Sequence, residues 1–193
     1  MKGLTFSEPM VKAWLNGTKT VTRRLMKPQP SEGAYPHHEE KDGFAFANPC
    51  SFHKPRYLPG ETVYIKETWA TPIDDPNTTE IGLVSYLASE QLLAGHWKIK
   101  SPRFMPEWAS RSHALIVSVR PEMVQEITPE EIKKEGLVVQ DFAGIGIMFL
   151  LGLTPETYME SVALQEFKAL WESLHPGSWD RNDWVWRIEL KKV

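Results

Sequence analysis

Residues 17–24 combine three cations with three threonines, and this is the part of the chain best suited to chemistry. A threonine hydroxyl attacks a carbonyl only if a base removes its proton. A lysine amine can be that base if burial or nearby cations lower its pKa. The same cations could instead bind a phosphate. The run therefore predicts either a nucleophile site built on Lys19 and Thr22 or a phosphate clamp built on Lys19, Arg23 and Arg24.

These two functions place different demands on the backbone around the run. Residues 8–16 have the apolar spacing of a short helix, which Gly17 can cap, and the β-branched residues 18–25 predict a strand. On a strand, Thr22 and Arg24 lie on the same face. Lys19 would join them only if the chain turns near Gly17. A converging lysine and threonine therefore require a helix-to-strand turn at this point.

A glutamate late in a predicted helix is the candidate acid. Thr128 can cap a helix that begins with proline, and Glu131 is placed to complete a capping box. The helix should end near Gly136. Glu135 lies at its C-terminal end, where the helix dipole disfavours a carboxylate, so a structural role accounts for it less well.

Three further residues have side chains suited to binding a base. Glu67 ends a strand predicted over 62–69, and it could hydrogen-bond a base edge or form a salt bridge. The chain has eight tryptophans, most of which should lie in the core. Trp69 and Trp108 are candidates for stacking on a base. No histidine or cysteine spacing resembles a metal site, so we expect no metal and no cofactor.

Composition limits the class of protein. The chain has 193 residues, of which 41 % are hydrophobic, and this fits a single domain of ordinary size or one with a large insertion. Its net charge of −3 argues against a globally basic nucleic-acid binder. Residues 1–27, however, carry six cations against one acid, which suits an anionic ligand or a solvated basic face.

The expected environment is the cytoplasm. There is one cysteine, so no disulfide can form within the chain. We expect no signal peptide and no membrane span, because no apolar run is long enough.

The predicted elements favour an α+β fold. Residues 26–59 are rich in proline and read as a long irregular segment, and residues 142–153 have no clear pattern. Because strands and helices do not alternate regularly, we expect a small, mostly antiparallel β-barrel decorated by helices. Strands are predicted over 18–25, 62–69, 81–87, 113–119 and 184–190, and helices over 8–16, 128–136 and 154–174.

The motif Gly17-x-Lys19-x-x-Thr22-x-Arg24 after a short helix resembles the signature of ASCH domains, which belong to the PUA-like superfamily. Residues 59–63 resemble the family's turn into its next strand. Residues 117–119 leading to 127–128 resemble the strand before its helix, and 184–190 its closing strand. The chain as a whole is similar to phage and prophage members, in which 66–69, 105–111 and 184–186 recur. The resemblance implies a single domain over 1–193 with inserts near 28–57, 71–100 and 138–153.

The resemblance implies a PUA-like β-barrel whose cleft receives RNA or a nucleoside. One small bacterial enzyme of the family removes the acetyl group from 4-acetylcytidine. Carried over, Lys19 would accept a proton, Thr22 would be the nucleophile and Glu135 would donate a proton to the leaving nitrogen. Arg24 would stabilise the oxyanion or hold the charge of the site. This chain departs from the pattern at Arg23, where an apolar residue is usual.

Three functions follow as hypotheses. The first is an amidohydrolase acting on an acylated cytidine. The second is a non-enzymatic reader of RNA or of a modified base, or a ribonuclease, in which Lys19, Arg23 and Arg24 contact phosphates while Trp69 or Trp108 stacks on a base. The third is a phage morphogenesis or host-interaction protein that reuses the barrel.

Overall fold

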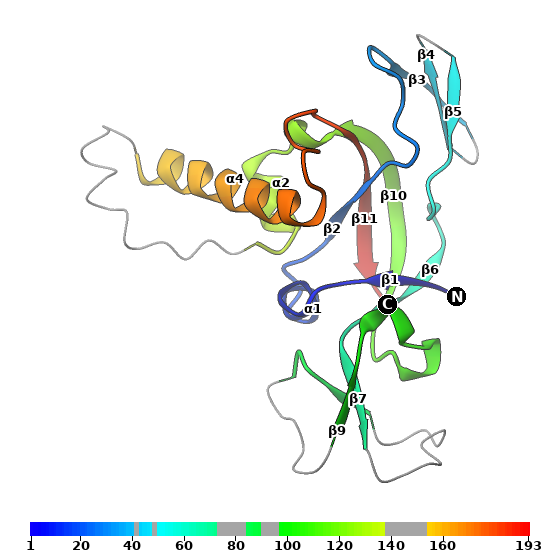
Figure 1. The fold of residues 1–193 in the computed structure, drawn as a ribbon, viewed down its shortest axis with the longest axis vertical. Coiled ribbons are helices and arrows are strands. Elements are labelled where there is room, and N and C mark those ends of the chain that lie inside the picture. Colours follow the sequence, from blue (N-terminus) through cyan, green and yellow to red (C-terminus); the bar gives the residue numbers. More distant parts are fainter. Residues whose placement is uncertain (41–42, 48–49, 73–83, 90–96, 138–153) are drawn as a thin grey trace.

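The computed structural model describes residues 1–40, 43–47, 50–72, 84–89, 97–137 and 154–193. A five-stranded sheet lies at the centre of the molecule, with one three-stranded sheet toward each end of the long axis (Figure 1). Helices pack beside the central sheet, and most strand pairs are antiparallel. The predicted α+β class is therefore confirmed.

The central sheet has the strand order β1-β6-β10-β11-β2. Only the pair of β1 and β6 is parallel. Within the described residues the two edge strands, β1 and β2, do not pair with each other, so hydrogen bonding leaves the predicted barrel open between them. The strands span Lys2–Thr5 (β1), Val21–Leu25 (β2), Thr62–Lys66 (β6), His113–Met123 (β10) and Trp184–Lys192 (β11).

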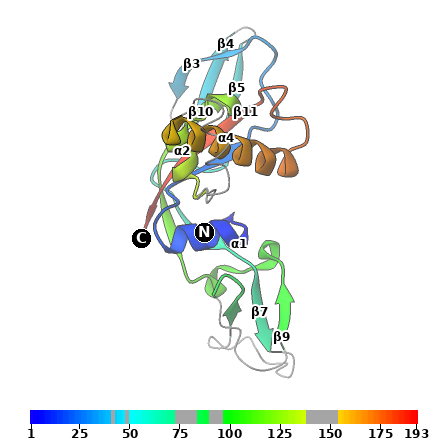
Figure 2. The ribbon, with the colours of Figure 1, turned by 90° about the vertical axis from the view of Figure 1, so that its left-hand side faces the viewer.

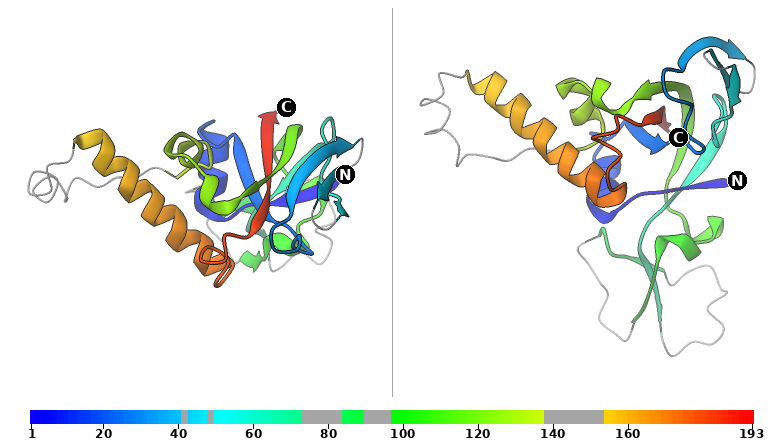
Figure 3. Two further views of the ribbon diagram at one scale, coloured as in Figure 1. Left: turned by 90° about the horizontal axis from the view of Figure 1, so that it is seen from above. Right: turned by 45° about the horizontal axis from the view of Figure 1, so that its top comes forward.

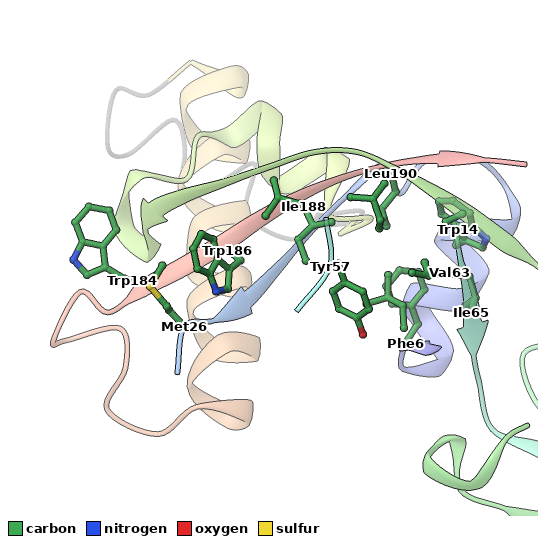
Figure 4. Packing of buried hydrophobic residues seen from close by; sticks show 14 of the residues in the cluster. Phe6, Trp14, Met26, Tyr57, Val63, Ile65, Trp184, Trp186, Ile188 and Leu190 are labelled. Atoms are coloured by element: carbon green, nitrogen blue, oxygen red, sulfur yellow. The ribbon is translucent and has the colours of Figure 1, made fainter. Parts of the chain in front are cut away.

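The main core lies on one face of this sheet. The alternating apolar residues of β11 that the sequence indicated all point into it, and Trp14 from α1 (Glu8–Leu15) packs at one end (Figure 4). Burial of this face is the main stabilising contribution to the sheet. Its labelled members include Phe6, Trp14, Met26, Tyr57, Val63, Ile65, Trp184, Trp186, Ile188 and Leu190.

Helices α2 (Pro129–Lys134) and α4 (Pro155–Leu174) pack on the other face of the sheet (Figures 2 and 3). Thr128 caps α2 as predicted, and Thr154 caps α4, since each hydroxyl accepts from a backbone N–H three residues on. Val185 of β11 faces these helices and is buried. This strand therefore buries both faces, where the sequence pattern indicated one.

The irregular structure predicted for residues 26–59 was wrong. A three-stranded antiparallel sheet forms there, comprising β3 (Tyr35–Glu40), β4 (Gly43–Ala47) and β5 (Ser51–His53). Phe44 and Phe46 of β4 explain it, because their rings pack against Trp186 and Trp184 of the central sheet, with centroids 5.6 and 5.1 Å apart.

The other small sheet comprises β7 (Trp69–Pro72), β8 (Ser85–Tyr86) and β9 (Trp97–Lys100). Of the strand predicted over 81–87, only the part from residue 84 is described, and β8 lies within it. The segment 142–153 lies outside the described residues. Short 3-10 helices at Pro102–Phe104, Glu107–Ala109 and Val124–Glu126 complete the fold.

None of the helices in the described part of the chain combines the length and the apolar character needed to cross a membrane.

Candidate functional site

The turn that the sequence analysis required is present between α1 and β2. Gly17 has a positive φ of 84°, a conformation that glycine adopts without steric cost. The backbone N–H of Lys19 then donates to the carbonyl of Ala13, 3.0 Å away, and that of Thr20 donates to Lys134, 2.8 Å away. These two hydrogen bonds hold the turn against α1 and α2, and the Lys19 side chain points inward.

The Lys19 side chain is fully buried and all three of its N–H groups are used. Its Nζ donates to the carbonyl oxygens of Val21 and Glu135 and to Glu135 Oε2, each at 2.8 Å. Burial lowers the pKa of Lys19, and the adjacent Glu135 carboxylate opposes that shift. The structure therefore brings together two of the three predicted catalytic residues, which lie 116 residues apart in the chain.

Glu135 is also held by Arg23. Its Oε1 accepts from Arg23 Nη1 at 3.1 Å. Arg23 Nε donates to Glu122 at 2.6 Å, and Arg23 Nη2 donates to Glu131 at 3.0 Å. The Arg23 side chain is 1 % exposed, so it points into the protein, opposite to Thr22 and Arg24 on β2. Its guanidinium binds three carboxylates here, whereas the sequence analysis assigned it to a phosphate.

Arg187 of β11 completes the network through two bonds of 2.9 Å to the Glu131 carboxylate. The Glu131 side chain therefore binds two arginines. Of the predicted capping box, only the half in which Thr128 accepts from the Glu131 N–H is formed. We call these six residues the ion-pair cluster, and its three cations balance three carboxylates: Lys19, Arg23, Arg187, Glu122, Glu131 and Glu135.

A cavity of about 320 Å³ opens beside the cluster, and we call it the cleft. Thr22 and Arg24 line it from β2, and Glu135 lines it from the end of α2. Aromatic rings of α4, Phe167 and Trp171, form its apolar side. This volume is at the small end of the range for ligand pockets. The cleft therefore places a hydroxyl, a cation and a carboxylate beside a surface suited to a flat ring.

Arg24 occupies the mouth of the cleft. Its Nη2 donates to the Thr5 carbonyl at 2.6 Å, which bridges the two unpaired edges of the central sheet. Burial lowers the pKa of its guanidinium, although arginine stays protonated at neutral pH. Arg24 therefore places a positive charge at the cleft.

His175 is a cleft residue that the sequence analysis did not single out. It follows α4, and its ring packs on Trp171 with centroids 4.6 Å apart. Burial lowers the pKa of His175, and the nearby cations Lys27 and Arg24 lower it further. The only signal in the sequence was its place at a predicted helix end.

Glu67, Trp69 and Trp108 are not among the residues that line the cleft. Glu67 is buried, and its carboxylate accepts two hydrogen bonds of 2.8 Å from Arg111. Of its two predicted roles, it therefore forms the salt bridge, and its carboxylate is not free to contact a base. Trp69 is 3 % exposed, and its ring lies nearly perpendicular to that of Trp108, with the ring centroids 6.0 Å apart. Trp108 keeps an exposed fraction of 47 %.

Within the part of the chain that the structure describes, no group of three or more histidine, cysteine, aspartate or glutamate residues is placed to hold a metal ion.

No family model matches the chain, and no curated protein or solved structure is significantly similar to it.

The ion-pair cluster predicts a loss of stability in acid. The two arginines hold the pKa of Glu131 at about 2, against an ordinary value of 4.5. Since the carboxylate titrates lower when folded, its contribution is complete above pH 4.5 and is lost as the pH falls toward 2. The full contribution is roughly 3 kcal/mol. Glu131→Gln should therefore flatten the fall in unfolding free energy over this interval, measured by urea denaturation.

The neighbouring exposed Glu130 provides the control for that series. Glu130→Gln should follow the wild-type pH dependence. A wild-type profile for Glu131→Gln would contradict the role given to the two arginines.

The close packing of Gly136 predicts a second effect on stability. Gly136 has φ of 86°, and a Cβ there would lie 2.6 Å from that of Ala13 and 3.1 Å from that of Lys19. Left-handed strain and overpacking together should make Gly136→Ala about 2 to 4 kcal/mol less stable. Gly60 has φ of 84° with nothing within 4 Å, so Gly60→Ala should lose only about 1 kcal/mol. Equal losses in thermal or urea unfolding would show that the Lys19 stem is not tightly packed.

Proposed function

We propose that this protein hydrolyses the amide of an acylated cytosine base, of the 4-acetylcytidine type, in the cleft. One observation carries the proposal: the fully buried Lys19 ammonium donates a 2.8 Å hydrogen bond to the Glu135 carboxylate, and Thr22 lines the cleft beside this pair. Lys19 bonds to the carbonyl of Val21, the residue before Thr22, so the amine lies next to the nucleophile's own peptide.

The Lys19–Glu135 pair can supply both a base and an acid. Moving one proton from the Lys19 ammonium to the Glu135 carboxylate yields a neutral amine and a carboxylic acid without changing the net charge. Burial penalises separated charges, and the lowered pKa of Lys19 has the direction that this transfer requires. General acid–base catalysis works best when the two groups exchange protons easily near working pH.

The proposed reaction has two halves, acylation of Thr22 and hydrolysis of the acyl-threonine. Lys19 takes the hydroxyl proton as Thr22 Oγ1 bonds to the acyl carbon, and Arg24 stabilises the developing oxyanion. The carbon–nitrogen bond breaks, and Glu135 gives its proton to the exocyclic nitrogen, which releases cytidine and restores the ion pair. In the second half, a proton again moves from Lys19 to Glu135, and water attacks the acyl-threonine while Lys19 accepts a proton from the water. The bond between the acyl carbon and Thr22 Oγ1 breaks, and Glu135 gives its proton to that oxygen, which releases the free acid and restores the ion pair.

The test is conversion of 4-acetylcytidine to cytidine by the purified protein, followed by chromatography. The wild type and Trp108→Ala should both form cytidine, because Trp108 lies outside the residues that line the cleft. No cytidine above the uncatalysed background with either protein, across neutral and mildly alkaline pH, would refute the proposal.

Base recognition without hydrolysis is the second candidate. The observation in its favour is that Lys19 already donates all three of its protons and both Glu135 oxygens accept, so the cluster is complete as a static support. In that case the protein should bind 4-acetylcytidine at equilibrium and leave the acetyl group in place.

A further inference from the structure

A second and larger cavity, of about 870 Å³, adjoins the cleft, and we call it the basic groove. It lies between the unpaired edges of the central sheet, with β1 on one side and β2 on the other. The chain as a whole has a net charge of −3. The groove nevertheless has no carboxylate in its lining and six cations: Arg24, Lys27, Lys54, Arg56, Lys66 and Arg103.

The positive charge of the groove is largely uncompensated. Among the described residues, five of these cations form no ion pair with a carboxylate, and they are Arg24, Lys27, Arg56, Lys66 and Arg103. Two are positioned by neutral carbonyl oxygens: Lys66 donates to Arg103 at 2.7 Å, and Arg24 donates to Thr5. Carbonyls fix these side chains without neutralising them, so the groove is suited to an anion with several charges.

The groove borders the cleft. Thr5, Arg24 and Pro102 line both cavities, and Arg24 presents its guanidinium at the boundary. An extended anion in the groove would therefore end at the mouth of a cleft with aromatic walls. An acidic peptide offers charges but no flat ring for such walls, whereas a polynucleotide offers phosphates and bases together.

We propose that the basic groove binds the phosphodiester backbone of a single-stranded polynucleotide, so that the base entering the cleft belongs to a polymer. The strand is single because a base within a duplex cannot reach an enclosed cleft without leaving its stack. This inference rests on the proposed function for the chemistry in the cleft, but the binding to the groove stands independently of it.

The binding experiment uses the whole protein and a fluorescent twelve-nucleotide oligocytidylate, about the length of a single-strand binding site, with anisotropy measured over a salt series. Six phosphate contacts would give a slope of log affinity against log salt of about −4. RNA and DNA versions separate recognition of phosphates alone, which gives equal affinities, from added recognition of the 2′-hydroxyl, which favours RNA. Either result supports the groove.

The groove variant is Arg56→Gln with Arg103→Gln, two exposed side chains outside the cleft. Losing two contacts should reduce the slope by about 1.4 and weaken binding about tenfold at low salt. The matched control is Lys168→Gln with Lys191→Gln, exposed cations that do not line the groove. The control should bind like the wild type.

Three results would overturn the groove assignment: no binding by the wild type, equal weakening in both double variants, or displacement of the oligonucleotide by polyglutamate of equal charge. The two proposals fail separately. If free 4-acetylcytidine is hydrolysed but no oligonucleotide binds, the groove assignment fails alone. If oligonucleotides bind with the expected slope but neither nucleoside nor acetylated oligomer is hydrolysed, the proposed function fails and the groove stands.

Discussion

Replacing Glu135 by alanine is expected to lower the free energy of unfolding by about 3 to 5 kcal/mol. The carboxylate accepts from Lys19 at 2.8 Å and from Arg23 at 3.1 Å, and both cations have side chains no more than 1 % exposed. Without this carboxylate, the buried Lys19 ammonium loses its ionic partner, and the buried Arg23 guanidinium loses one of its three. Urea unfolding at neutral pH, followed by tryptophan fluorescence, measures the change.

Two further variants separate the buried pair from a general effect of losing charge. Glu107 pairs with the N-terminal amine at the surface, so Glu107→Ala should change stability by less than about 1 kcal/mol. Combining Lys19→Met with Glu135→Leu removes both charges and should be milder than the sum of the single changes. A Glu135→Ala variant as stable as Glu107→Ala would show that the cluster is not needed to hold the site.

Thr22→Val is expected to reduce turnover of 4-acetylcytidine by about a thousandfold or more, since it removes the proposed nucleophile. Thr22 is buried on β2, and valine keeps its branched shape and strand preference. Thr22→Ser keeps the hydroxyl and should retain measurable turnover. The comparison uses steady-state turnover rates of the three proteins, measured where all three are folded. Equal turnover by Thr22→Val and the wild type would exclude Thr22 as the nucleophile.

The local geometry of the site could be predicted from the sequence. The helix, Gly17 and the β-branched run indicated where the chain would have to turn for Lys19 to approach Thr22, and the structure has a turn there. The apolar spacing after Thr154 predicted a helix over 154–174, and α4 spans Pro155–Leu174. Such features depend on neighbours a few residues apart, which a single sequence displays.

The long-range electrostatics could not be predicted. Arg23 reads as one more surface cation in a basic run, because its partners Glu122 and Glu135 lie 99 and 112 residues further along the chain. The positive N-terminal segment proved to be divided. Lys19 and Arg23 are buried with carboxylates, whereas Arg24 and Lys27 line the groove with four cations from residues 54–103.

The small sheet over residues 35–53 shows why proline-rich sequence misled the fold prediction. Prolines and glycines indicated an irregular segment, and β3 even contains Pro36. The strands form because Phe44 and Phe46 find tryptophans of β11 to pack against, and that contact is tertiary.

A single-turnover reaction, with protein in excess over 4-acetylcytidine, tests the central claim most directly. The wild type and Thr22→Val are compared side by side after equilibrium binding has shown that both take up the nucleoside. The account predicts that the wild type converts the substrate into equal amounts of cytidine and acetate, while Thr22→Val leaves it intact. Conversion by Thr22→Val at the wild-type rate, or bound substrate left intact by the wild type, would contradict it.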